Sequence, residues 1–143
     1  MKKITEIDIF KELISKAEKG SELMINGFYT GTLSDKNFRK LFSKNDVPKR
    51  ENFSHYIIDL NTENIKKITE ILNLEGENLI DDITHFAIKN DKKFSAFSFD
   101  HMEMIQIDKS QFKTDKFEFE NYNFDEIEIS LQEELNNNGF FEW

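Results

Sequence analysis

The chain has 143 residues, a net charge of −9, 38% hydrophobic residues and no cysteine. This length fits one domain with its own hydrophobic core, and the lack of cysteine excludes a disulfide framework and thiolate catalytic or metal sites. No segment approaches the ~20 consecutive apolar residues of a membrane-spanning helix, so we expect no membrane partner.

The N-terminal segment predicts an amphipathic helix over residues 5–19. Apolar side chains recur there at helical spacing, and Gly20 stands where a helix usually ends. These side chains are Ile7, Phe10, Leu13, Ile14 and Ala17. Charged residues within the segment interrupt the apolar run that a secretory signal peptide requires. We therefore expect a cytoplasmic protein.

Residues 22–33 predict a strand with a turn or bulge, because apolar and aromatic residues are interrupted there by Gly27 and Gly31. A serine that can cap a helix precedes a short predicted helix at residues 35–44. The stretch from 35 to 50 carries six bases and two acids. We expect these bases to form a solvated face or to pair with the acidic face of the fold, and not to bind nucleic acid directly, because acidic residues elsewhere in the chain would weaken their field.

The middle of the chain predicts a strand followed by a helix. Residues 54–60 alternate between two sets of side chains, as a strand does. Thr62 opens a helical pattern that runs to residue 74, and Gly76 stands beyond its expected end.

An antiparallel meander is predicted next. Residues 83–89, 94–99 and 102–108 are rich in β-branched and aromatic residues, and polar turns separate them at 90–93 and at Asp100–His101. Apolar residues occupy both sides of these strands, which is typical of central strands covered on both faces.

The acidic end of the chain has the clearest alternation. In residues 116–120 and 125–131, apolar side chains alternate with acidic or polar ones. This pattern predicts strands with one face on the core and one face of carboxylates in water. We therefore expect a single α+β domain spanning residues 1–143, with about three helices packed on a mainly antiparallel sheet of six to seven strands.

Candidate catalytic groups are few. Asp100, His101 and Glu103 lie within four residues of one another and are the types that hold metals or transfer protons. A metal site would need a further ligand, such as His55 or His85, to converge with them. Motifs of serine hydrolases, phosphate-binding loops and dinucleotide folds are missing. We expect turn and surface roles for these residues, no enzyme activity, no metal and no cofactor.

The charge of the chain is concentrated at one end. Residues 1–116 hold 19 bases and 20 acids, whereas residues 117–143 hold eight acids and no base, so −8 of the net −9 lies in the last 27 residues. Such asymmetry indicates either a solvated face or a charged interaction surface. The predicted partner-binding residues are Glu118, Glu120, Asp125, Glu126 and Glu128, with Phe140, Phe141 and Trp143 as aromatic anchors or as core residues.

These features predict a small acidic, non-enzymatic protein, expected to be a monomer, that binds a basic protein partner such as a nuclease. Its size and acidity are those of immunity proteins that neutralise bacterial toxin nucleases, and of phage-encoded anti-defence proteins of the anti-CRISPR kind. In both cases carboxylates would occupy the basic groove where phosphates normally bind. Two other classes remain open: a small acid–base or metal-assisted enzyme using Asp100, His101 and Glu103, and an adaptor whose charge serves only solubility.

Overall fold

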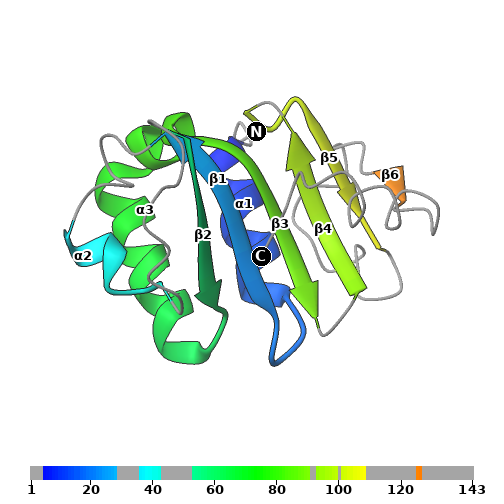
Figure 1. Ribbon diagram of the computed structural model, residues 1–143, viewed down its shortest axis with the longest axis horizontal. Coiled ribbons are helices and arrows are strands. Elements are labelled where there is room, and N and C mark those ends of the chain that lie inside the picture. The colour runs from blue at the N-terminus through cyan, green and yellow to red at the C-terminus, as the bar shows by residue number, and fades with distance from the viewer. Residues whose placement is uncertain are drawn as a thin grey trace, which may run out of the picture.

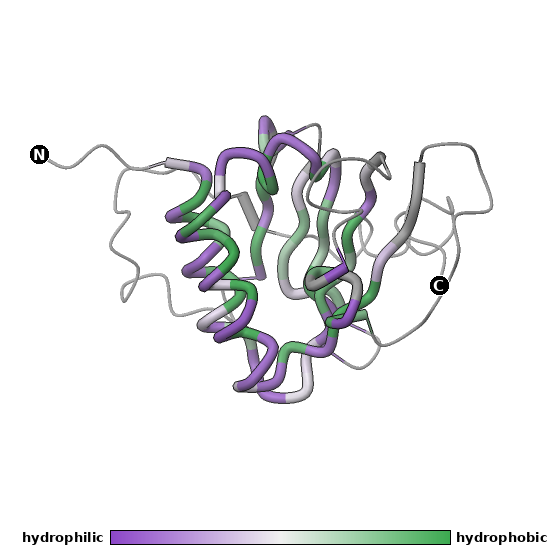
Figure 2. The backbone as a smooth tube through the Cα atoms, turned by 90° about the vertical axis from the view of Figure 1, so that its left-hand side faces the viewer, coloured by the Kyte–Doolittle hydropathy of each residue, from purple (hydrophilic) through white to green (hydrophobic). Residues whose placement is uncertain are grey.

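The computed structural model describes residues 5–28, 36–42, 53–90, 93–99, 101–108 and 125–126. It has an α+β fold in which two helices pack on one face of an antiparallel sheet (Figures 1 and 2). The elements are α1 (Glu6–Lys16), β1 (Glu22–Phe28), α2 (Lys36–Arg39), β2 (Phe53–Asp59), α3 (Thr62–Asp82), β3 (Ile83–Asn90), β4 (Lys93–Phe99), β5 (Met104–Ile107) and β6 (Asp125–Glu126).

The strand order in the sheet is β2-β1-β3-β4-β5-β6. The first five strands are antiparallel to their neighbours, whereas the two-residue β6 runs parallel to β5. The α+β class and the antiparallel sheet are thus confirmed. The predicted count of three helices and six to seven strands is not matched in detail, because two helices and five antiparallel strands make up the main body of the described chain.

Helix α1 forms where the sequence predicts it, and local hydrogen bonds cap its N-terminus. The Thr5 side chain accepts a hydrogen bond from the Asp8 backbone, and the Asp8 carboxylate accepts one from the Thr5 backbone N–H at 3.1 Å. This capping box satisfies backbone donors that have no partner within the helix. Ala17 is already extended, so the helix ends before the predicted residue 19, and Gly20 then turns the chain with φ of 91°.

Helix α3 begins as predicted but continues further. Asn61 caps it by accepting a hydrogen bond from the Asn64 backbone at 2.8 Å. Helical geometry is interrupted at Glu75, which has φ of −138° and ψ of 32°, and then resumes to Asp82. The predicted end at residue 74 therefore matches the interruption and not the end of the helix.

Gly76 does not terminate α3; it allows α1 to approach closely. A Cβ atom placed on Gly76 would lie 2.9 Å from Cδ1 of Ile7, which is too close for two carbon atoms. Glycine at this position therefore serves helix–helix packing, and the interpretation of Gly76 as a helix stop is wrong for this reason.

The predicted helix 35–44 is described only in part. Four residues, Lys36–Arg39, are helical, and Phe42 then forms an isolated antiparallel bridge with Ile58 of β2. The Phe42 ring lies 4.6 Å from that of Tyr56 and 5.5 Å from that of Phe38. This aromatic cluster attaches the segment to the β2 end of the sheet.

The meander of β3, β4 and β5 is confirmed, and its central strands are buried on both faces. On the helix side, the Phe86 ring of β3 meets the Phe10 ring of α1 edge-on at 5.0 Å. On the other side, Met24, Ala87 and Phe97 are neighbours in register and are each at most 2% exposed. The predicted bulge near Gly27 also occurs, as a register shift between Asn26 and Gly27.

The predicted strands 116–120 and 125–131 lie outside the described residues, apart from Asp125 and Glu126 of β6. The pairing of β6 with β5 is parallel, within a sheet that was predicted to be mainly antiparallel. None of the helices in the described part of the chain is long and apolar enough to span a membrane.

Candidate functional site

Two residues of the acidic segment 117–143 form the last strand in the sheet order, β6. Asp125 pairs in register with Gln106, and Glu126 pairs with Ile107. The other predicted partner-binding residues, Glu118, Glu120, Glu128, Phe140, Phe141 and Trp143, lie outside the described residues. The structure thus places two residues of the acidic segment beside β5, and the carboxylate face remains a prediction.

The turn between β4 and β5 carries two of the three candidate catalytic residues. His101 and Glu103 are both exposed, whereas Asp100 lies outside the described residues. His101 and Met102 have positive φ angles of 55° and 68°, a conformation that costs non-glycine residues free energy. The His101 backbone N–H donates to the carbonyl of Thr84 at 2.8 Å, and the buried Met102 side chain joins the core. These two contacts hold the strained turn in place.

The residues do not assemble into a metal centre in the described structure. No group of three or more His, Cys, Asp and Glu residues within the described ranges could hold a metal ion. The register places Asn26 of β1 between His55 of β2 and His85 of β3, so these two histidines are two strands apart. His85 is half-buried and has an interaction of its own.

The basic stretch 35–50 is described over α2 and the short turn after it. Lys36 and Lys40 are exposed there, while Phe38 and Leu41 are buried in the core. The remaining bases of this stretch, apart from Arg39 in α2, lie outside the described residues. The apolar side chains of α2 and of the turn after it therefore attach the basic segment to the core.

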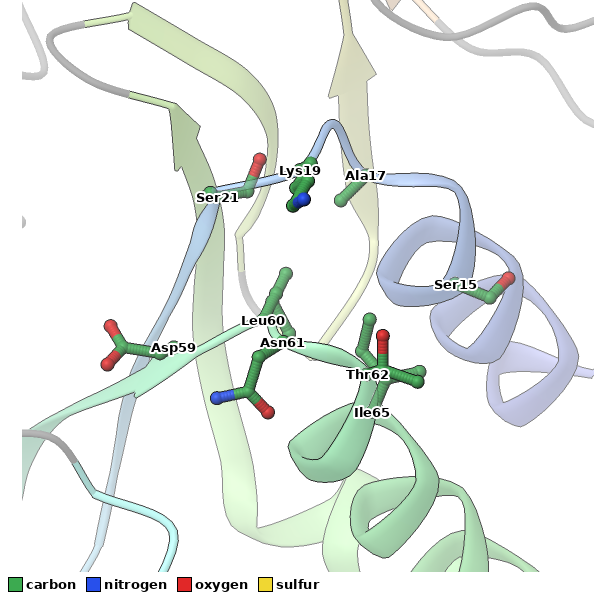
Figure 3. A pocket seen from close by; sticks show the side chains of 10 residues that line it. Ser15, Ala17, Lys19, Ser21, Asp59, Leu60, Asn61, Thr62 and Ile65 are labelled. Carbon is green, nitrogen blue, oxygen red and sulfur yellow. The ribbon is translucent and has the colours of Figure 1, made fainter.

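A cavity of about 670 Å³ lies where α1 ends and α3 begins, and no sequence pattern predicts it (Figure 3). Its walls come from two segments: residues 15–21, from the end of α1 to the residue before β1, and residues 59–65, from the end of β2 into the first turn of α3. The Leu60 backbone N–H donates to the Ser21 carbonyl at 2.9 Å and ties these connections together. Their meeting depends on β1 pairing with β2, which spacing in the sequence does not reveal.

The polar groups around this cavity mostly serve the backbone. The Ser21 hydroxyl donates to the Glu18 carbonyl at 2.6 Å, the Ser15 hydroxyl donates to the Glu12 carbonyl at 3.0 Å, and Asn61 caps α3. In Figure 3, Leu60 extends into the cavity and the Asp59 carboxylate points away from it. The lining thus has one amine, Lys19, and one outward carboxylate, which is a poor basis for acid–base chemistry.

The outer face of α3 is a second acidic surface that the sequence analysis left aside. From Ile68 to Asp82 the chain has five acids and no base. Four of the acids are exposed: Glu70, Glu75, Glu77 and Asp81. Because the helix was expected to end at residue 74, its last acids were expected in a loop or at the edge of a helix. The signal that extends the helix is the continued apolar spacing at Leu72, Leu79 and Ile80.

Comparisons with known proteins give no relatives: no family model, no curated protein and no solved structure matches this chain.

Proposed function

We propose that the protein is a small acidic binding protein that neutralises a basic partner, most simply a nuclease, as immunity proteins do. The observation that carries the proposal is the charge asymmetry, with −8 of the net −9 in residues 117–143. Such a surface would attract a cationic groove over a distance and raise the rate of association. The carboxylates would then meet the Lys and Arg side chains that otherwise bind phosphates.

The position of β6 supports this mechanism. Asp125 and Glu126 extend the sheet beyond β5, so two acidic residues of the segment lie on a regular element of the fold. Binding groups on a strand lose less conformational freedom in a complex than groups on a free chain. Glu118, Glu120 and Glu128, with the aromatic anchors Phe140, Phe141 and Trp143, would complete the contact.

A phage-encoded protein that blocks a host nuclease, of the anti-CRISPR kind, would use the same surface and the same chemistry. The identity of the partner separates this second proposal from an immunity protein. An acid–base enzyme built on Asp100, His101 and Glu103 is the weaker proposal, because the cavity described above is lined by other residues.

Reversal of three acids tests the proposal. The triple variant Glu118→Lys, Glu120→Lys and Glu128→Lys should abolish capture of the basic partner from the native cell, and added salt should weaken capture by the parent protein. The control variant reverses three exposed acids elsewhere, Glu6, Glu18 and Glu103, and so has the same net charge. Unchanged capture by the first variant, or equal loss with the control, would rule out recognition by the acidic segment.

A further inference from the structure

The face of the sheet opposite the helices, called here the second face, is apolar and buried. Met24 of β1, Ala87 of β3 and Phe97 of β4 are neighbours in register on this face, and each is at most 2% exposed. Ile57 of β2 pairs with Met24 and is 5% exposed. These side chains lie outside the core cluster that the helices share with the sheet.

None of the helices in the described ranges covers the second face. Figure 2 shows the helices on one side of the sheet, and residues of α1, α2 and α3 all belong to the core cluster on that side. The second face is buried within a single chain, so a second copy is not what covers it. The cover therefore comes from a part of this chain outside the described residues.

The second face also holds an acceptor that needs a donor. Gln106 of β5 is in register with Phe97, and its side-chain oxygen Oε1 is buried without a hydrogen-bond partner among the described residues. Buried polar atoms are nearly always paired. A chain segment that crosses this face would bring backbone N–H groups to Gln106.

The composition of the remaining segments selects the C-terminal one. Residues 29–35 and 43–52 lead to and from the α2 segment, and together they hold three hydrophobic residues. Residues 109–124 connect β5 to β6, and parallel strands need a crossover of roughly a dozen residues or more. Residues 127–143 follow β6 without such a task and hold seven hydrophobic residues. The other gaps are at most four residues long and are too short to cross the face.

The C-terminal segment is also long enough. The sheet has five steps from β6 to β2, which at about 4.8 Å each make roughly 24 Å. An extended chain covers about 3.3 Å per residue, so about eight residues suffice. The seventeen residues 127–143 can therefore cross the whole face and still include a turn.

The hydrophobic residues of this segment fall on one side of an extended chain, because residues two apart point the same way. In residues 127–131, apolar side chains alternate with polar ones. Phe141 and Trp143 are two apart and share a side, whereas Phe140 and Glu142 point the other way. One side of the segment can thus pack on a sheet while the other side carries carboxylates.

We infer that residues 127–143 cross the second face as a strap. Phe141 and Trp143 pack around Met24, and the carboxylates of the strap point to solvent on the side of the molecule opposite the helices. The partner would then meet the protein on this side. That consequence rests on the proposed function, whereas the strap itself does not. The strap also narrows the aromatic part of the proposed contact to Phe140.

The fluorescence of Trp143 tests the strap in the full-length protein, because Trp143 is the single tryptophan of the chain. Its emission should be blue-shifted and protected from quenching by acrylamide, and unfolding in urea should remove both properties. Met24→Ala should shift the emission to the red and increase quenching. The control is Leu23→Ala, the neighbour on β1 that faces the helices, which should leave both unchanged. Circular dichroism checks that each variant is folded.

A second measurement leaves the described core intact. Replacing both Phe141 and Trp143 by Ala should uncover part of the second face and increase the binding of the dye ANS, which reports exposed apolar surface. The control is Phe140→Ala, which removes an aromatic ring from the solvent side of the strap. Its binding of the dye should equal that of the parent protein.

Four results would overturn the strap. An exposed Trp143 in the folded parent protein, equal responses of Trp143 to Met24→Ala and Leu23→Ala, or equal dye binding by the double variant and the parent would each place the aromatic residues elsewhere. Protection of Trp143 that is lost on dilution would show that a second copy receives the segment.

The strap and the proposed function can fail separately. If Trp143 is protected while reversal of Glu118, Glu120 and Glu128 leaves capture of the native partner intact, the strap holds and the carboxylate mechanism is wrong. If the reversal abolishes capture while Trp143 is exposed in the free protein, only the strap is wrong.

Discussion

The two halves of α3 differ in what holds them in helical form. The first half, from Thr62 to Leu74, has an Asn61 cap and an ion pair between Glu63 and Lys67, so its helical form has strong local support. The second half starts at Gly76 and ends in acids. Glycine and C-terminal acids both disfavour a helix. The second half therefore depends on its contacts with α1 and on its direct continuation into β3.

Truncating Leu79, the buried leucine of the second half, should give the largest effect. Leu79 is fully buried and Leu74 is mostly exposed, although both lie on the same helix. Leu79→Ala should lower the free energy of unfolding by about 3 kcal/mol, because it removes packed methyl groups and leaves a cavity. Leu74→Ala should change it by less than about 0.5 kcal/mol. Urea unfolding followed by circular dichroism measures both, and similar losses would contradict the tertiary origin of this half.

Removing the cap should give an intermediate effect on the first half. The Asn61 side chain accepts a hydrogen bond from the Asn64 backbone N–H, which has no partner within the helix. Asn61→Ala should therefore cost about 1 kcal/mol of stability, whereas Asn61→Asp should retain the cap. Thermal unfolding compares the two variants. An Asn61→Ala variant as stable as the parent would mean that packing, and not capping, also holds the first half.

Reversing an acid near the end of α3 should give the smallest effect, and in the opposite direction. Asp81 is exposed and lies in the last turn, where no base is present. Asp81→Lys should raise stability by about 0.3–0.5 kcal/mol at low salt, because a cation is favoured at the negative end of a helix. The gain should shrink at high salt, whereas Glu63→Lys at the start of α3 should be destabilising. If Asp81→Lys lowered stability, the acid would be making a structural contact.

The elements that could be predicted are those with local signals. The apolar spacing of α1, the alternation of β2 and the antiparallel pairing of β3 with β4 depend on residues close in the chain, and all three occur near the predicted positions. Burial of the central strands on both faces also follows from their apolar composition. The parallel pairing of β6 with β5 was not predictable, because no local pattern encodes the partner of a short strand.

The candidate surfaces were harder to predict for the same reason. The C-terminal acids were found by counting charges, since a run of 27 residues without a base is visible in any sequence. The acidic outer face of α3 was missed because Gly76 resembles a helix stop unless its contact with Ile7 is known. The cavity beside Leu60 requires β1 and β2 to pair before its two walls meet.

The sequence by itself determined the α+β class, the positions of the first helix and the central strands, and the unequal distribution of charge along the chain. These properties follow from the order of side chains along the backbone and need no distant contact. Only the tertiary structure decided that α3 continues past Glu75 and that Leu74 and its neighbouring acids face solvent together. The physical reason is that a glycine is compatible both with the end of a helix and with close packing against a neighbouring helix. Only the segment that packs against it decides which of the two occurs.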